Sequence, residues 1–181
     1  MREIEVKARL QDRNKTMKAI KALGCVFNEP IAQSDRIYML PEYIGLATHQ
    51  GNVLRIRVQN GKALFTLKRS ITNELDCLEK ELAVSDSAVM ADIIDLLGYK
   101  EYAHVLKTRQ KSKYKDYEIC LDDVEGLGSF IEVEKLVEEN IETQEQDKLF
   151  EFLAALGISK EDRVMQGYDT LVYNQNHMTD V

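Results

Sequence analysis

The chain has 181 residues, the length of one domain or of two small ones. Hydrophobic residues make up 44% and charged residues 30%, a mixture that can bury a core and excludes a disordered or collagen-like chain. The 24 Lys and Arg against 31 Asp and Glu give a net charge of −7, which argues against a general nucleic-acid-binding protein.

The predicted elements alternate between strands and helices along the chain. Strands are expected at residues 2–10, 25–40, 53–58, 63–69, 78–84, 102–113, 115–122 and 129–137. Helices are expected from Asp12 to Leu23, from Ser85 or Ser87 to Leu97, and from a capping box of Thr143 and Gln146 to Leu156. Asn60-Gly61 is a strong hairpin signal between two of the strands. The stretch 163–173 has a mixed pattern.

This order of elements predicts an α+β protein with about eight mostly antiparallel strands. No linker or change of composition marks a boundary, so we expect one domain over residues 1–175 and a loose tail at 176–181. A homodimer is the assumed state, because homodimers are common among small enzymes.

Signals for export or membrane insertion are not apparent. No run of about 18 apolar residues occurs, so no membrane-spanning helix and no membrane partner are expected. The first residues, MREIEVKARL, lack the apolar core of a signal peptide. Cys25, Cys77 and Cys120 are widely spaced and are interpreted as buried free thiols. These features favour a cytoplasmic protein.

Nearly every predicted strand carries two like charges two residues apart. Because successive side chains of a strand point to opposite faces, each such pair shares a face that is opposed by apolar residues. The pairs are Glu3 and Glu5, Arg55 and Arg57, Glu79 and Glu81, Lys107 and Arg109, and Glu132 and Glu134. Amphipathic helices need the apolar faces to pack against, so we expect the charged faces to line the inside of a closed or nearly closed barrel.

An interior of this kind is costly unless its charges are paired or hydrated, since burial of an ion costs several kcal/mol. We therefore interpret it as a hydrated tunnel for a charged ligand, with the bases binding a polyanion and the acids binding cations. A nucleoside triphosphate with a divalent metal matches both sets. Carboxylates as ligands favour Mg²⁺ or Mn²⁺ over zinc. Glycine-rich phosphate loops, HExxH and the Gly-x-Ser-x-Gly elbow are absent from the sequence.

The string Glu3-Ile4-Glu5-Val6-Lys7 resembles the ExExK signature of the CYTH superfamily, the triphosphate tunnel metalloenzymes. The resemblance covers nearly the whole chain and is strongest for stand-alone class IV adenylyl cyclase-like (CyaB-type) proteins. The further segments that match in the family's order are 54–57, 66–68, 79–81, 107–109, 121–128 and 130–134.

The resemblance implies an eight-stranded antiparallel β-barrel, the triphosphate tunnel, with flanking helices. It implies phosphate binding by Lys7, Arg55, Arg57, Lys68, Lys107 and Arg109. It places Glu3, Glu5, Asp122, Glu132 and Glu134 around Mg²⁺ or Mn²⁺, Glu132 and Glu134 most directly. Lys7, Glu5 and Asp122 would take part in catalysis, and Glu79 and Glu81 would orient the cations.

Two reactions are compatible with such a tunnel. The first is conversion of ATP to cyclic AMP and pyrophosphate, which the overall similarity favours. The second is release of the terminal phosphate from inorganic, nucleoside or thiamine triphosphate. The chain has no Trp to contact a thiamine ring, although Tyr38 or Tyr43 could substitute. A non-catalytic module that binds nucleotide or polyphosphate is a third possibility, which the acidic residues disfavour.

The sequence departs from the family pattern at two places. Arg69 follows Lys68 where Gly-Pro is often found, and Gly167-Tyr168 stands at the place of a Ser-Tyr pair. Both lie where the non-phosphate part of a substrate is expected to bind.

Overall fold

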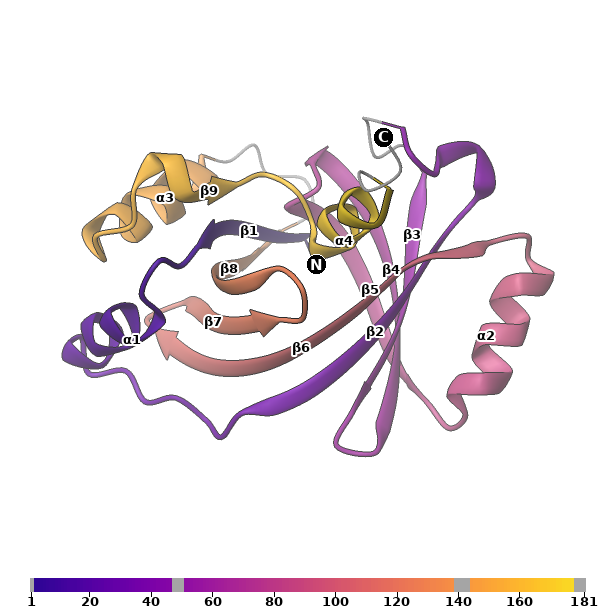
Figure 1. The fold of residues 1–181 in the computed structure, drawn as a ribbon, viewed down its shortest axis with the longest axis horizontal. Coiled ribbons are helices and arrows are strands. Elements are labelled where there is room, and N and C mark those ends of the chain that lie inside the picture. The colour runs from indigo at the N-terminus through magenta and orange to yellow at the C-terminus, as the bar shows by residue number, and fades with distance from the viewer. Residues whose placement is uncertain (1, 47–50, 139–143, 178–181) are drawn as a thin grey trace.

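Eight antiparallel strands close into a barrel, as predicted (Figure 1). The computed structural model describes residues 2–46, 51–138 and 144–177. The barrel strands are β1 (Arg2–Arg9), β2 (Ile31–Met39), β3 (Asn52–Gln59), β4 (Lys62–Asn73), β5 (Asp76–Val84), β6 (Lys100–Tyr114), β7 (Tyr117–Val124) and β8 (Gly128–Val137). They follow each other around the barrel as β5-β4-β3-β2-β6-β7-β8-β1. Pairing of β1 with β5 closes the ring.

Four α-helices flank the barrel within the described ranges. They are α1 (Arg13–Ala22), α2 (Ser87–Leu96), α3 (Glu145–Ala155) and α4 (Tyr168–His177). In Figure 1, α1 and α3 lie at one end of the molecule, α2 lies at the other, and α4 lies between them. Short 3₁₀ helices occupy Pro41–Tyr43 and Lys160–Asp162, and the two-residue strand β9 (Arg163–Val164) pairs with β1.

The helices cover the apolar outer faces of the strands. Predicted outward-facing residues of β1 and β8 form one buried cluster with side chains of α1 and α3: Ile4, Val6, Ile131, Val133, Ile20, Leu149 and Leu153. A second cluster joins Leu54 and Ile56 of β3 to Ile94 of α2. Burial of each large aliphatic side chain contributes roughly 1.5–3 kcal/mol, so these contacts fix which face of each strand looks inward.

The predicted hairpin between β3 and β4 is confirmed. Asn60 and Gly61 have φ angles of 49° and 70°. Positive φ at both central residues is what a type I′ turn requires, and its twist matches that of the flanking strands. The turn thereby sets Arg57 opposite Leu64 and Arg55 opposite Thr66.

The start of α2 differs from the prediction. The residue that caps the helix is Asp86, not Ser85 or Ser87: its carboxylate accepts hydrogen bonds from the backbone N–H groups of Ala88 (2.8 Å) and Val89 (3.1 Å). A carboxylate at this place also interacts favourably with the helix dipole, which a serine does not.

Two other features of the C-terminal part depart from simple sequence patterns. Thr143 of the expected capping box lies outside the described residues, and the side chain of Gln146 donates a hydrogen bond to the backbone oxygen of Glu5 (3.1 Å). The mixed stretch 163–173 contains β9 and the start of α4. Tyr168 is the one buried residue of α4. With a single buried position, the helix lacks the apolar periodicity that would have predicted a helix here.

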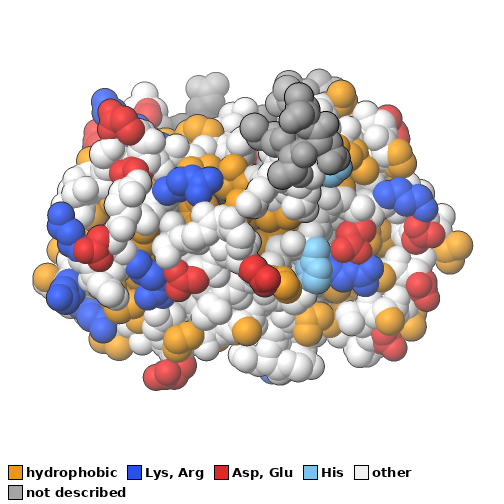
Figure 2. Space-filling view, in the orientation of Figure 1, with side chains coloured by type: hydrophobic (Ala, Val, Ile, Leu, Met, Phe, Trp, Pro, Cys, Tyr) orange, Lys and Arg blue, Asp and Glu red, His pale blue; other side chains and the backbone are white. Residues whose placement is uncertain are grey.

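The described part of the chain contains no helix with both the length and the apolar character needed to cross a bilayer. On the face shown in Figure 2, Lys and Arg side chains are interspersed with Asp and Glu.

Candidate functional site

The barrel surrounds a cavity of about 460 Å³, which lies in the range of roughly 300–1,000 Å³ typical of small-molecule sites. All the predicted site residues except Asp122 line it: Glu3, Glu5, Lys7, Arg55, Arg57, Lys68, Glu79, Glu81, Lys107, Arg109, Glu132 and Glu134. The structure therefore brings together charged side chains from β1, β3, β4, β5, β6 and β8.

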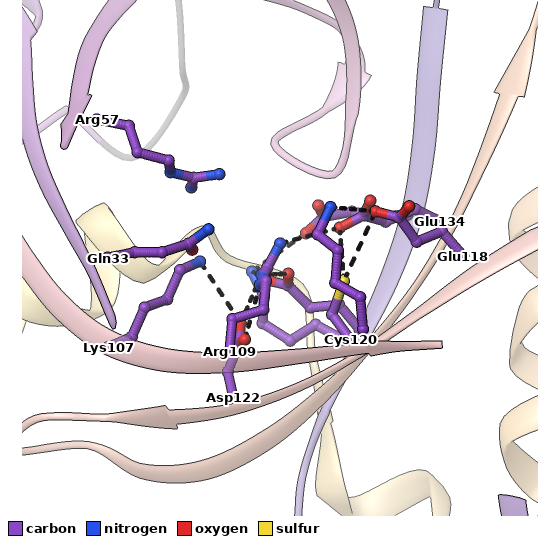
Figure 3. Close-up of polar contacts among 12 residues, drawn as sticks. Gln33, Arg57, Lys107, Arg109, Glu118, Cys120, Asp122 and Glu134 are labelled. Atoms are coloured by element: carbon purple, nitrogen blue, oxygen red, sulfur yellow. Dashed lines mark hydrogen bonds and ion pairs between the residues drawn. The ribbon is translucent and has the colours of Figure 1, made fainter. Parts of the chain in front are cut away.

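Asp122 lies behind the cavity wall, where it holds two of the cations. Its fully buried carboxylate accepts hydrogen bonds from Nε (2.7 Å) and Nη2 (2.5 Å) of Arg109. Nζ of Lys107 is 3.5 Å from the same carboxylate. Figure 3 shows Asp122 beneath Arg109 and Lys107, so it orients both cations from the barrel wall.

Glu132 is engaged by cations on two sides. Nζ of Lys7 is 3.1 Å from its Oε1, and Arg109 forms an ion pair with its Oε2. Burial alone would raise the pKa of Glu132, but Arg109 and Lys7 hold this pKa well below its usual range. Lys7 is further fixed by Glu5, whose Oε1 lies 3.2 Å from Nζ, and by the backbone oxygen of Gln166 (3.1 Å), which accepts a hydrogen bond from it.

Three other carboxylates crowd together on the β1–β8 side. One oxygen each from Glu3, Glu5 and Glu134 lie within 4.8 Å of one another. Burial, followed by the charge of Glu132, raises the pKa of Glu5 to about 7. Burial, followed by the charge of Glu134, raises the pKa of Glu3 well above its usual range, and burial also raises that of Glu134. A divalent cation relieves this repulsion, and a set of oxygen donors fits Mg²⁺ or Mn²⁺.

Glu134 also belongs to a second group of possible ligands. Its carboxylate lies close to the carboxylate of Glu118 and to the thiol of Cys120. Both groups have cations nearby, since Lys111 pairs with Glu118, Lys7 with Glu5 and Arg109 with Glu134. The Glu3, Glu5 and Glu134 group is the better match to Mg²⁺ or Mn²⁺, because it offers three carboxylates whereas the other group includes a thiol.

Two other buried cations of the cavity form only long ion pairs. Nε of Arg55 has no hydrogen-bond partner among the described residues, and its Nη2 lies 3.4 Å from Glu81. Nζ of Lys107 is 3.5 Å from Asp122, and burial, followed by the charge of Arg109, lowers the pKa of Lys107 to about 8. An anion near these side chains would stabilise their charged forms. The cavity therefore contains cations suited to an anion as well as crowded carboxylates suited to a cation.

Lys68 and Glu79 also line the cavity. They lie opposite each other on β4 and β5 and form an ion pair, so Glu79 balances the charge of Lys68. Glu81 accepts a hydrogen bond from the hydroxyl of Thr66 (2.9 Å), and that hydroxyl in turn accepts one from Arg55 (3.1 Å). The orienting role of Glu79 and Glu81 stays a prediction.

Asp35 and Gln33 of the site were not identified from the sequence, whereas Tyr168 was singled out there as part of the Gly167-Tyr168 pair. Asp35 is buried against Arg57, and Gln33 lies on the same face of β2. Ala32, Ser34 and Arg36 on the other face of β2 do not form an apolar face, so no amphipathic alternation marks Gln33 and Asp35 as inward-facing. Tyr168 enters from α4, with its ring centroid 4.2 Å from Nζ of Lys7 and 4.7 Å from Nζ of Lys107. No local pattern predicts this contact.

Some of the tyrosines and of the departures from the family pattern lie at the cavity, and others lie away from it. Tyr38 and Tyr43 do not line this cavity, and Tyr168 does. Arg69 also lies outside the lining and donates a hydrogen bond to Oδ1 of Asn52 (2.9 Å). Gly167 lines the cavity, and its N–H donates to Glu74 (2.7 Å).

Comparison with known proteins agrees with this geometry. The CYTH domain model matches residues 1–168. A protein of Methanocaldococcus jannaschii, provisionally named an adenylate cyclase, is 32% identical over 171 residues, which are 93% of this chain and 97% of that protein.

Solved structures show the same fold. A Pyrococcus horikoshii protein superimposes with a TM-score of 0.79 at 29% identity, covering 96% of this chain and 99% of its own. A Hippeastrum protein, described as revealing a dominant triphosphatase activity, superimposes with a TM-score of 0.60 at 18% identity, covering 97% and 96% of the two chains. With a family match over nearly its whole length and the charged cavity that the ExExK signature predicts, the chain belongs to the CYTH domain family.

Proposed function

We propose that this protein is a metal-dependent enzyme that acts on a triphosphate, and that its reaction is conversion of ATP to cyclic AMP and pyrophosphate. The observation that carries the proposal is the composition of one cavity: it is lined by the buried cations Arg55 and Lys107, whose ion pairs with carboxylates are long (3.4 and 3.5 Å), and by the crowded carboxylates of Glu3, Glu5 and Glu134. A polyanion and a divalent cation together would satisfy both sets of charges.

The cations of the site would grip the phosphates. Arg55 and Arg57 of β3 and Lys107 of β6 line the cavity on either side of β2, and Lys7 and Arg109 reach the same cavity from β1 and β6. Asp122 and Asp35 hold Arg109 and Arg57 in fixed orientations, so the donors are preorganised for phosphate oxygens. Charge-assisted hydrogen bonds of this kind contribute roughly 1.5–3 kcal/mol each.

Glu3, Glu5 and Glu134 would hold Mg²⁺ or Mn²⁺. When bound, the metal supplies Lewis acidity and neutralises charge on the phosphates. Lys7 and Arg109 also pair with Glu5 (3.2 Å) and Glu134 (3.5 Å), but Glu132 and Asp122 lie outside the carboxylate group and both pair closely with Arg109, so we assign these two acids to orienting the cations. This narrows the five acids implied by the resemblance to three proposed ligands.

In the proposed reaction, the 3′ hydroxyl of the ribose gives up its proton to water, its oxygen forms a bond to the α-phosphorus, and the bond from that phosphorus to the bridging oxygen of pyrophosphate breaks, so that pyrophosphate leaves with that electron pair. Positioning and charge stabilisation supply most of the catalysis in reactions of this type. The adenylate cyclase name of the M. jannaschii relative supports this assignment.

Triphosphatase activity is the second candidate. The same cations, among them Arg55, Arg57 and Lys107, would bind the phosphates while water attacks the terminal phosphorus. The phosphate-binding residues therefore do not distinguish the two reactions. The triphosphatase described for the Hippeastrum protein supports this alternative, since that protein has the same fold.

Product analysis tests the proposal. The protein is incubated with ATP and, separately, with inorganic triphosphate, in the presence of Mg²⁺ or Mn²⁺, and cyclic AMP, pyrophosphate and phosphate are measured together. Cyclic AMP with equimolar pyrophosphate supports the cyclase. Phosphate without cyclic AMP supports the triphosphatase, and no product with any of these combinations contradicts both.

A further inference from the structure

Tyr168 of α4 has a buried hydroxyl that is not bonded to any described residue. The side chain lines the cavity and is 6% exposed. Its hydroxyl oxygen is buried and has no hydrogen-bond partner among the described residues. Burial, followed by the charges of Glu132 and Asp122, raises the pKa of Tyr168 well above its usual range, so the hydroxyl keeps its proton. A ligand that accepts a hydrogen bond from a buried, unpaired donor gains affinity, because the unpaired donor is unfavourable in the empty protein.

The surroundings of Tyr168 hold its hydroxyl oxygen in one place. The ring packs edge-on against Phe130, with the ring centroids 5.2 Å apart. The start of α4 is tied to the turn between β4 and β5, because Glu74 accepts hydrogen bonds from the backbone N–H of Gly167 (2.7 Å) and from the hydroxyl of Thr170 (2.9 Å). A rotation of the ring by half a turn leaves the phenol oxygen where it is. The donor is therefore preorganised before any ligand binds.

Two ammonium groups lie against the ring of Tyr168. Nζ of Lys7 on β1 is 4.2 Å from the ring centroid, and Nζ of Lys107 on β6 is 4.7 Å from it. Lys7 is already engaged by two carboxylates and a backbone oxygen. The ion pair of Lys107 with Asp122 is long, at 3.5 Å, and Figure 3 shows the Lys107 side chain extending past this partner. An anion attracted to Lys107 therefore lies beside the ring of Tyr168.

The chemistry of these neighbours selects the acceptor for the hydroxyl. An ammonium group has three donors and no acceptor, so neither Lys7 nor Lys107 can take the hydrogen bond. An ionised phosphate oxygen carries lone pairs and can accept from both donors at once. We propose that Tyr168 is a substrate-binding residue whose hydroxyl donates to a phosphate oxygen bound at Lys107. The family pattern suggested instead a place near the organic part of the substrate. This inference rests on the proposed function and adds a residue to the same site.

The variant Tyr168→Phe tests the inference, because it keeps the ring beside the two lysines and removes the hydroxyl. Isothermal titration calorimetry with EDTA present gives the dissociation constants of ATP and of inorganic triphosphate without metal-dependent turnover. Both ligands should bind about tenfold more weakly, and by the same factor, as expected for loss of one hydrogen bond to a charged group.

The matched control is Tyr38→Phe. The hydroxyl of Tyr38 is also buried without a partner among the described residues, and a cation, Arg36, lies 5.6 Å from its ring centroid. Tyr38 differs in lying outside the cavity lining, so this variant should leave both dissociation constants unchanged. Urea denaturation without ligand supplies a second readout. The midpoint of Tyr168→Phe should equal that of the parent, because the hydroxyl has no partner to lose in the empty protein.

Unchanged affinity of Tyr168→Phe for both ligands would overturn the inference. Weaker binding of ATP alone would also overturn it, since the hydroxyl would then contact the organic part. Weaker binding together with a lower urea midpoint would indicate a structural role and not a contact with the ligand. If the parent binds neither ATP nor triphosphate, the proposed function fails and this inference fails with it. If the parent binds both and Tyr168→Phe binds them equally well, only the assignment of Tyr168 fails.

Discussion

The carboxylate of Asp35 on β2 accepts two hydrogen bonds from the guanidinium of Arg57 on β3, 2.7 Å from Nε to Oδ1 and 2.6 Å from Nη2 to Oδ2. The two residues face each other directly in the register of the sheet, and both are buried. The planar fork of arginine matches the two carboxylate oxygens, so the pair holds Arg57 in one orientation at the cavity wall.

Removal of Asp35 should destabilise the fold. Asp35→Ala leaves the buried charge of Arg57 without its partner, and loss of one member of such a pair typically costs about 3–5 kcal/mol. Urea denaturation measures the free energy of unfolding. The matched control is Asp95→Ala, which breaks the exposed pair with Lys100 and should cost about 0–1 kcal/mol. Similar losses in the two variants would contradict a special role for the Asp35–Arg57 pair.

The same pair should make stability depend on pH in the acid range. Burial alone would raise the pKa of Asp35, but the hydrogen bonds and charge of Arg57 hold it well below its usual range. The unfolded aspartate binds its proton near pH 3.9, whereas the folded one does so at lower pH. The stabilisation is therefore complete above about pH 5 and is lost as the pH falls toward the folded pKa.

Urea denaturation of the parent and of Asp35→Ala between pH 7 and pH 3 measures this effect. The difference in unfolding free energy between the two should be constant at neutral pH and should shrink as the solution becomes more acidic. A difference that grows on acidification has the wrong sign for a lowered carboxylate pKa.

Arg55 should contribute strongly to binding of the polyanion. Arg55→Ala removes a buried cation whose Nε has no partner among the described residues, so ATP and triphosphate should both bind about tenfold more weakly or worse. Isothermal titration calorimetry gives the dissociation constants. Arg36→Ala serves as the control, because Arg36 lies on the same sheet but pairs with Glu101 in an exposed position. Unchanged affinity in Arg55→Ala would exclude a phosphate contact.

Glu134 should matter for turnover more than for nucleotide binding. Glu134→Ala removes one of the three proposed metal ligands and leaves the proposed phosphate-binding cations in place. Turnover should therefore collapse even at saturating ATP, whereas ATP binding measured in EDTA should persist. Excess Mn²⁺, which carboxylate sites generally bind more tightly than Mg²⁺, should restore part of the rate. Glu101→Ala is the control for loss of a carboxylate elsewhere on the barrel. Parent-level turnover in Glu134→Ala would show that the metal ligands are wrongly assigned.

Much of the barrel could be predicted from the alternation of charged and apolar side chains along each strand. Glu3 and Glu5 share a face, as do Arg55 and Arg57, because side chains alternate along a strand, and this holds before any partner strand is known. The apolar residues between them, such as Ile4 and Ile56, are driven by burial to the helix-covered side. Local chemistry also placed the Asn60-Gly61 turn, since few other dipeptides accept positive φ at both positions.

Which charged residues pair with each other depends on contacts between strands that are distant along the chain. Pairing of β1 with β8 sets Lys7 opposite Glu132 and Glu5 opposite Glu134. Arg109 from β6 pairs with Glu132 and, at 3.5 Å, with Glu134, whose carboxylate also lies beside those of Glu3 and Glu5. Tyr168 reaches Lys7 and Lys107 from a helix near the C-terminus. A strand's own pattern specifies which face looks inward, but the register of the closed barrel specifies which charges meet, because ion pairing acts over a few ångströms.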